Sequence, residues 1–207
     1  HGALSARVSL RMAFAGRRRA IGLLMGVNTM RGLAMTGAAL SLTWMAKSRG
    51  GDSVEAGAWV GVFLLAGGVG SLLCGFAEDR RRERRRLVAT MVLAIGPRMA
   101  LPGLSGWMFR SAMVVAGLLG NATAPMVVSI SQRLVPGGAR VASALMMGVS
   151  WSVGSTAGSL VAGAIHNGAT AHASWWSFGT MAGAMVPAAI CAAMVGDGGE
   201  AATRKEP

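Results

Sequence analysis

Arg31 and Asn28 are the residues whose chemistry most needs an explanation, because both lie within the apolar run 20–46. A guanidinium near the middle of a membrane costs about 2.5–3.5 kcal/mol on insertion scales, and such residues usually face a bundle interior or a wet cavity. Asn28 precedes Arg31 by three residues, which places both side chains on one face of a helix. The pair predicts a contact for a substrate or a gate. A structural bond from Arg31 to backbone carbonyls is the alternative.

Two other apolar runs carry side chains that could bind a ligand. Asn121 and Thr123 come shortly before Pro125, and a proline within a helix frees the backbone carbonyl one turn earlier. Both are therefore candidates for binding or gating, with local satisfaction of the kinked backbone as the alternative. Trp151 lies in the middle of the run 139–165, where an indole either stacks on a substrate or fills packing space.

Arg98 is a weaker candidate, because it lies near the outer end of its apolar run and can extend to the membrane surface. Carboxylates are expected only in loops, at helix ends and in the tail. The eight acids at such places are Asp52, Glu55, Glu78, Asp79, Glu83, Asp197, Glu200 and Glu206. A proton relay usually needs an intramembrane carboxylate. Coupling to protons would therefore require a carboxylate from outside this chain.

The elements that must position these residues are predicted to be membrane helices. The sequence is 53% hydrophobic and 14% charged, whereas a soluble domain carries about 25% charged residues. Six runs approach the roughly 20 residues that a bilayer requires, so we expect an all-α integral membrane protein. The predicted spans are 20–46, 54–77, 87–104, 110–131, 139–165 and 175–195.

The basic residues predict the orientation of these spans. Fifteen Lys and Arg lie on one proposed side and three on the other, with two more inside spans, and an excess of basic residues marks the cytoplasmic side. The basic approach segment 1–19 and the tail 196–207 are therefore expected in the cytoplasm. The net charge of +12 does not indicate nucleic-acid binding, because the charges form short clusters between apolar runs.

The sequence predicts neither an enzyme nor a cofactor. Cys74 and Cys191 both fall inside apolar runs and are interpreted as free packing residues. The three histidines lack zinc-ligand spacing. We find no Ser/His/Asp set, metal cluster or acid pair in any span.

A basic loop after the second span carries a family resemblance. Gly75, Asp79, Arg80 and Arg84 stand where the major facilitator superfamily has the loop motif G-x-L-A-D-R-x-G-R-R. The sequence departs from that motif at four positions, namely Ala77, Glu78, Arg82 and Glu83. The resemblance implies that the aspartate ties the loop to a neighbouring helix and helps to hold one access state. A basic loop that only sets orientation is the alternative.

Six spans with cytoplasmic ends resemble one half of such a transporter, which has twelve spans in two halves. Residues 30–33, 117–136 and 142–148 (MRGL, GLLGNATAPMVVSISQRLVP and ASALMMG) resemble the fosmidomycin-resistance subgroup of drug efflux proteins. The resemblance implies a C-terminal six-helix half in a bacterial inner membrane, with the N-terminal half missing. It implies antiport of small drugs or metabolites by alternating access. Because the first and fourth helices of a half line the central cavity in that family, Arg31 would meet an anionic substrate opposite Asn121.

Two functions therefore stay open at this point. The first is a secondary active transporter with a small-molecule substrate. The second is a six-span scaffold or interaction protein that transports nothing, and it predicts no need for Arg31 within the membrane.

Overall fold

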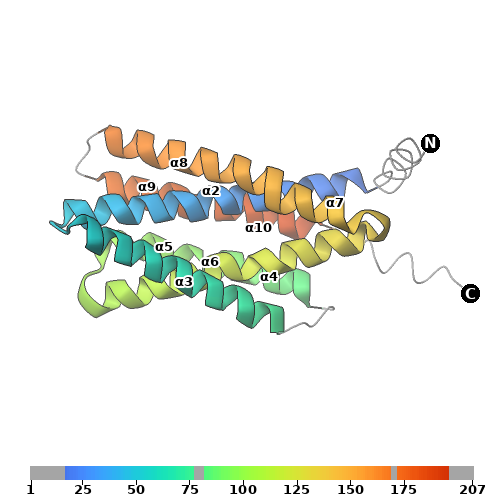
Figure 1. Cartoon of the computed structure of the whole chain (residues 1–207), viewed down its shortest axis with the longest axis horizontal. Coiled ribbons are helices and arrows are strands. Elements are labelled where there is room, and N and C mark those ends of the chain that lie inside the picture. Colours follow the sequence, from blue (N-terminus) through green and yellow to red (C-terminus); the bar gives the residue numbers. More distant parts are fainter. Residues whose placement is uncertain (1–16, 77–81, 169–171, 196–207) are drawn as a thin grey trace, which may run out of the picture.

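In the part of the chain that the structure describes, the fold is all-helical and has six helical segments that run along one axis (Figure 1). The computed structural model describes residues 17–76, 82–168 and 172–195, apart from the side chain of Pro136. The first two segments are α2 (Arg18–Ser48) and α3 (Ser53–Phe76), and the fourth is α6 (Gly106–Leu134). Helix α2 begins and α10 (Met185–Met194) ends at the same end of the bundle.

Three of the segments are interrupted. The third contains α4 (Glu83–Leu93), α5 (Ile95–Ala100) and the 3-10 turn η1 (Leu101–Gly103). The fifth follows the 3-10 turn η2 (Pro136–Gly138) and contains α7 (Ala139–Ala144), the π-helical turn η3 (Leu145–Ser150) and α8 (Trp151–Asn167). The sixth contains α9 (Ala173–Gly183) and α10.

Two of these interruptions have the same cause. Helix α4 ends at Leu93 and α9 ends at Gly183, and a proline lies four residues after each of them, Pro97 and Pro187. A proline lacks the N–H that would bond to the carbonyl four residues earlier, and its ring clashes with that carbonyl. The regular helix therefore stops and restarts at these positions.

Four of the described helical stretches are long and apolar enough to cross a membrane by length and composition: Ser53–Phe76, Gly106–Leu134, Ala139–Asn167 and Ala173–Met194. Helix α3 exposes large apolar side chains such as Leu65 and Leu72, with Phe76 86% exposed. Helix α6 begins at Gly106, four residues before the predicted fourth span. The exact membrane boundaries stay a prediction.

Glycines allow two pairs of helices to pack backbone against backbone. Helix α2 packs mainly against α8, and α3 packs mainly against α6. A Cβ on Gly154 or Gly158 of α8 would overlap a backbone carbonyl of α2, and one on Gly70 or Gly117 would overlap a carbonyl across the α3–α6 interface. Small residues permit such close approach in membrane helices. These interfaces fix α2, α6 and α8, the three helices that carry the candidate site.

Candidate functional site

The candidate site is centred on Arg31, whose side chain is only 1% exposed although it is charged. Its Nε and Nη2 donate hydrogen bonds to Oδ1 of Asn28, at 3.1 and 2.7 Å. Its Nη1 donates to Oδ1 of Asn121 on α6, at 3.2 Å. The guanidinium carbon lies 4.6 Å from the centre of the Trp151 ring on α8. The structure therefore brings together four of the five predicted site residues, from three helices.

Asn28 holds this cluster against the irregular part of the fifth segment. It lies one turn before Arg31, so both side chains point from the same face of α2. Its Nδ2 donates to the carbonyl of Met146 in η3. The neighbouring Thr29 donates its hydroxyl to the carbonyl of Ser150, at 3.2 Å. Because π turns within α-helices occur frequently at functional sites, we expect η3 to matter for the placement of Trp151.

The electrostatics of the cluster favour an anionic or carbonyl-bearing ligand. The described contacts use three of the five N–H groups of the Arg31 guanidinium, which leaves donors for a ligand. Among the described residues the buried polar side chains include Arg31 and Arg98 but no carboxylate. An anion beside Arg31 would therefore meet a positive charge that no described acid neutralises.

Thr123 does not join the cluster. It is buried, and its hydroxyl donates to the carbonyl of Gly120 on its own helix, at 3.2 Å. The geometry fits the alternative of local backbone satisfaction.

Ser71 is a residue that sequence reasoning missed. Pro125 leaves α6 unbroken but deprives the Asn121 carbonyl, four residues earlier, of its helical partner. The hydroxyl of Ser71 on α3 donates to that carbonyl, at 2.8 Å. Its only signal in the sequence is a small polar residue within a glycine-rich apolar run. Ser71 thus stabilises the backbone beneath the Asn121 side chain that contacts Arg31.

Arg98 corrects one expectation, because it does not extend to the membrane surface. Its side chain is 0% exposed, Nη1 donates to the carbonyl of Ala94 at 3.0 Å, and Nη2 contacts Sδ of Met35 at 3.2 Å. Its Nε has no hydrogen-bond partner among the described residues. The guanidinium lies against Gly120, where a Cβ would overlap it. Because Gly120 has no side chain, the Arg98 guanidinium fits beside it inside the bundle.

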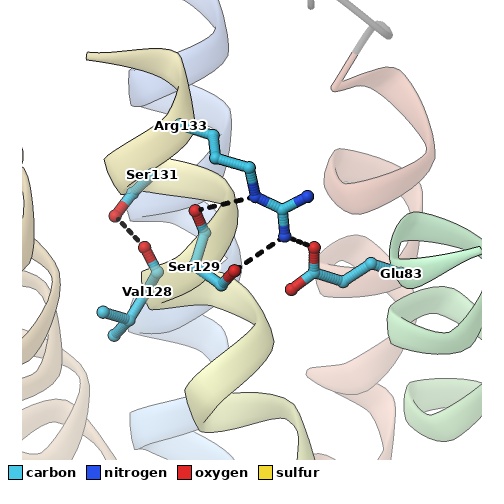
Figure 2. Close-up of polar contacts among 5 residues, drawn as sticks. All are labelled: Glu83, Val128, Ser129, Ser131 and Arg133. Atoms are coloured by element: carbon cyan, nitrogen blue, oxygen red, sulfur yellow. Dashed lines mark hydrogen bonds and ion pairs between the residues drawn. The ribbon is translucent and has the colours of Figure 1, made fainter. Parts of the chain in front are cut away.

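At the end of the bundle where α3 and α6 end, several arginine side chains lie close to the ends of helices. We call this region the arginine-rich end. Figure 2 shows Arg133 on α6 ion-paired with Glu83 on α4, while its Nη2 also donates to Oγ of Ser129 at 2.7 Å. Arg84 donates to the carbonyl of Val195 at the end of α10, at 3.0 Å. Cations near helix C-termini are favourable because unpaired carbonyls gather there.

The predicted loop motif is only partly visible in this region. Gly75 lies in the last turn of α3, and Arg84 makes the contact with α10 just described. Asp79 and Arg80 lie outside the described residues. The predicted tie between Asp79 and a neighbouring helix therefore stays a prediction.

A cavity of about 670 Å³ opens at the arginine-rich end, between α3, α4, α6 and η3. The Arg31 cluster does not line it. Among the described residues no group of three or more His, Cys, Asp or Glu side chains could hold a metal ion.

Comparison with known proteins identifies the family to which the chain belongs. No curated protein matches the chain. The family model described as Major Facilitator Superfamily matches residues 22–206, which includes nearly all of α2 and every later helix. Members of this family move small molecules across membranes and are not enzymes. The chain therefore belongs to the Major Facilitator Superfamily of multi-pass membrane transporters.

Proposed function

We propose that this chain forms part of a transporter that exports small anionic or carbonyl-bearing molecules by alternating access. The observation that supports the proposal is the buried guanidinium of Arg31, which side chains from α2, α6 and α8 surround. A charge inside a membrane protein is costly, and it usually marks a substrate or ion pathway. A bound anion would offset part of that cost each time the site is occupied.

The donors around Arg31 define the kind of group that would bind. A guanidinium is planar and always charged, and its fork of N–H groups matches the two oxygens of a carboxylate or a phosphonate. The Trp151 ring offers an apolar face beside it, which suits a substrate that carries a hydrophobic or aromatic body next to its anionic group. Asn28 and Asn121 fix the guanidinium in place through their Oδ1 atoms.

We further infer that the chain is the C-terminal six-helix half of a drug efflux antiporter of the fosmidomycin-resistance type. The resemblance of residues 117–136 and 142–148 supports this assignment. The N-terminal half would then supply the opposite wall of the cavity and the carboxylate for coupling. The excess of basic residues at the arginine-rich end favours a cytoplasmic location for that end and for both termini, in the inner membrane of a bacterium.

The loop motif would control one access state. Asp79 follows the end of α3, where the helix dipole disfavours an acid unless a partner compensates it. We expect Asp79→Asn to slow transport while the intact protein still inserts normally. Unchanged transport at normal expression would favour a loop that only sets orientation.

Ligand binding tests the proposed site directly. The intact protein, purified in detergent, is screened by thermal shift against small carboxylates, phosphonates and quaternary ammonium compounds, and the hits are followed by uptake into inverted vesicles. We expect anions alone to raise the melting temperature, and Arg31→Gln to abolish both that shift and transport. Arg110→Gln is the matched control, because Arg110 is exposed on α6 and its loss changes the net charge equally. Anion binding that survives Arg31→Gln would exclude Arg31 as the ligand.

A further inference from the structure

The cavity at the arginine-rich end has a lining with two distinct chemical regions. Its polar side chains are Glu83, Arg86, Ser129 and Gln132. Its apolar wall includes Pro125, Val128 and Met147. A ligand that fits this lining has a polar group at one end and a hydrocarbon body at the other.

The position of the cavity along the helices matches the depth of a lipid. Cys74 and Gly75 lie in the last turn of α3, and Gln132 lies in the last turn of α6, so the polar region lies where apolar helices give way to a basic loop. This is the level of the headgroups. Pro125 lies seven residues before Gln132 on α6, a distance of about 10 Å at 1.5 Å per residue. The apolar wall therefore extends to the depth of the acyl chains.

The charge beside the cavity selects the kind of lipid. Residues 78–86 contain six arginines and three acids, Glu78, Asp79 and Glu83, and so carry a net positive charge. The carboxylate of Glu83 is ion-paired with Arg133 (Figure 2). Basic pockets between membrane helices bind anionic headgroups, whereas the ammonium group of a zwitterionic lipid would be repelled by this segment.

We propose that the cavity binds one anionic phospholipid, with Arg86 contacting its phosphate and an acyl chain lying along the end of α3. The last two turns of α3 expose the apolar side chains of Leu72, Leu73 and Phe76 beside Cys74 and Gly75, and these form the surface for that chain. The proposal is independent of the Arg31 site, which does not line the cavity.

Native mass spectrometry of the intact protein measures this binding. The protein is titrated in detergent with dioctanoyl phosphatidylglycerol and, separately, with dioctanoyl phosphatidylcholine. The salt concentration is about 0.5 M, which shortens the Debye length well below 10 Å and suppresses non-specific attraction. We expect one tightly bound phosphatidylglycerol, no equivalent binding of phosphatidylcholine, and no displacement by inorganic phosphate, which lacks the acyl chain.

Two variants remove the two parts of the site separately. Arg86→Gln removes the phosphate contact and should weaken phosphatidylglycerol binding about tenfold. Arg85→Gln is its control, because Arg85 is exposed, carries the same charge and does not line the cavity. Gly75→Phe fills the cavity without a change of charge, since a Cβ at Gly75 meets no atom within 4 Å. Gly68→Phe on the same helix is its control, with equally open surroundings.

The results decide the proposal in either direction. Weaker binding in Arg86→Gln and Gly75→Phe, with both controls like wild type and melting temperatures unchanged, supports it. Equal affinity for the two lipids would overturn it. So would phosphatidylglycerol binding that neither cavity variant reduces, because the lipid would then lie elsewhere on the basic surface.

Discussion

Replacing Asn121 with aspartate should place a permanent competitor for the substrate beside Arg31. The two side chains have nearly the same shape, and Oδ1 of Asn121 already accepts a hydrogen bond from Nη1 of Arg31 at 3.2 Å. An aspartate there would keep the geometry and add a negative charge. The guanidinium would then be neutralised from within the protein, and an anionic substrate would lose its partner.

The magnitude follows from the spacing. Two unit charges about 4 Å apart interact with about 4 kcal/mol at an effective dielectric constant of about 20. A substrate anion that must approach the neutralised pair loses attraction of that order, which corresponds to about a thousandfold in affinity. The loss of attraction is smaller than this, because the substrate anion lies further from the aspartate than from the guanidinium, so the aspartate repels it less than the guanidinium attracts it. We therefore expect the KM for anions to rise by about a hundredfold or more.

The assay measures transport of an anion found in the thermal-shift screen, in inverted vesicles that contain equal amounts of each variant. Asn121→Leu is the control for the hydrogen bond, because it removes the acceptor from Arg31 without adding a charge, whereas the difference between wild type and Asn121→Asp reports the added charge. Arg31→Lys should recover only part of wild-type transport, since a point charge does not replace the planar fork. Arg31→Ala should abolish anion transport.

One result would refute the reasoning. If Asn121→Asp transports anions with an unchanged KM and is more stable than wild type, Arg31 is a structural cation that gains from an internal partner. Depletion of Arg31→Ala from the membrane would support the same conclusion.

Three further predictions concern the scaffold. Gly154→Leu should lower the melting temperature of the detergent-solubilised protein by several degrees, because its side chain would overlap the backbone of α2, whereas Gly148→Leu should not, since its surroundings are open. Ser71→Ala should cost about 1 kcal/mol in the free energy of unfolding, because it leaves a partly buried carbonyl without its donor; a denaturant titration that shows no loss would mean that the carbonyl finds another partner. Single cysteines in place of Arg82 and His172, in a background without native cysteines, should be labelled by an impermeant reagent in intact cells only at position 172, and labelling at position 82 would contradict the predicted orientation.

The burial of Arg31 and its pairing with Asn28 could be predicted from sequence, because helical spacing and membrane physics constrain them strongly. A charge in an apolar run must face the interior, and a residue three positions earlier shares its face. The convergence with Asn121 and Trp151 did not follow from spacing. The family resemblance implies it for Asn121, and the sequence alone does not distinguish stacking from packing for Trp151. The structure places Trp151 beside the guanidinium, and its role toward a substrate stays a prediction.

Other features could not be predicted, because they depend on which helices pack together. Whether Arg98 reaches the surface depends on the space beside Gly120, a residue of another segment. Likewise, Pro125 predicts an unpaired carbonyl, but the identity of its donor, Ser71, depends on the pairing of α3 with α6. Hydrophobic periodicity defines helices and their faces; it does not define their neighbours.

The π-helical turn η3 (Leu145–Ser150) has a consequence for insertions and deletions in the gene. The backbone N–H of Trp151, directly after this turn, donates to the carbonyl of Met146, five residues earlier, so this turn holds one residue more than an α-helical turn would. In-frame deletion of a single codon here would convert it to regular α-helix and leave α8 close to its present orientation, whereas deletion of a second codon would rotate α8 by about 100° relative to α7. Trp151 would leave Arg31, and Gly154 would turn away from α2. This turn can therefore lose one residue, but no more, before the site and its main helix interface move apart.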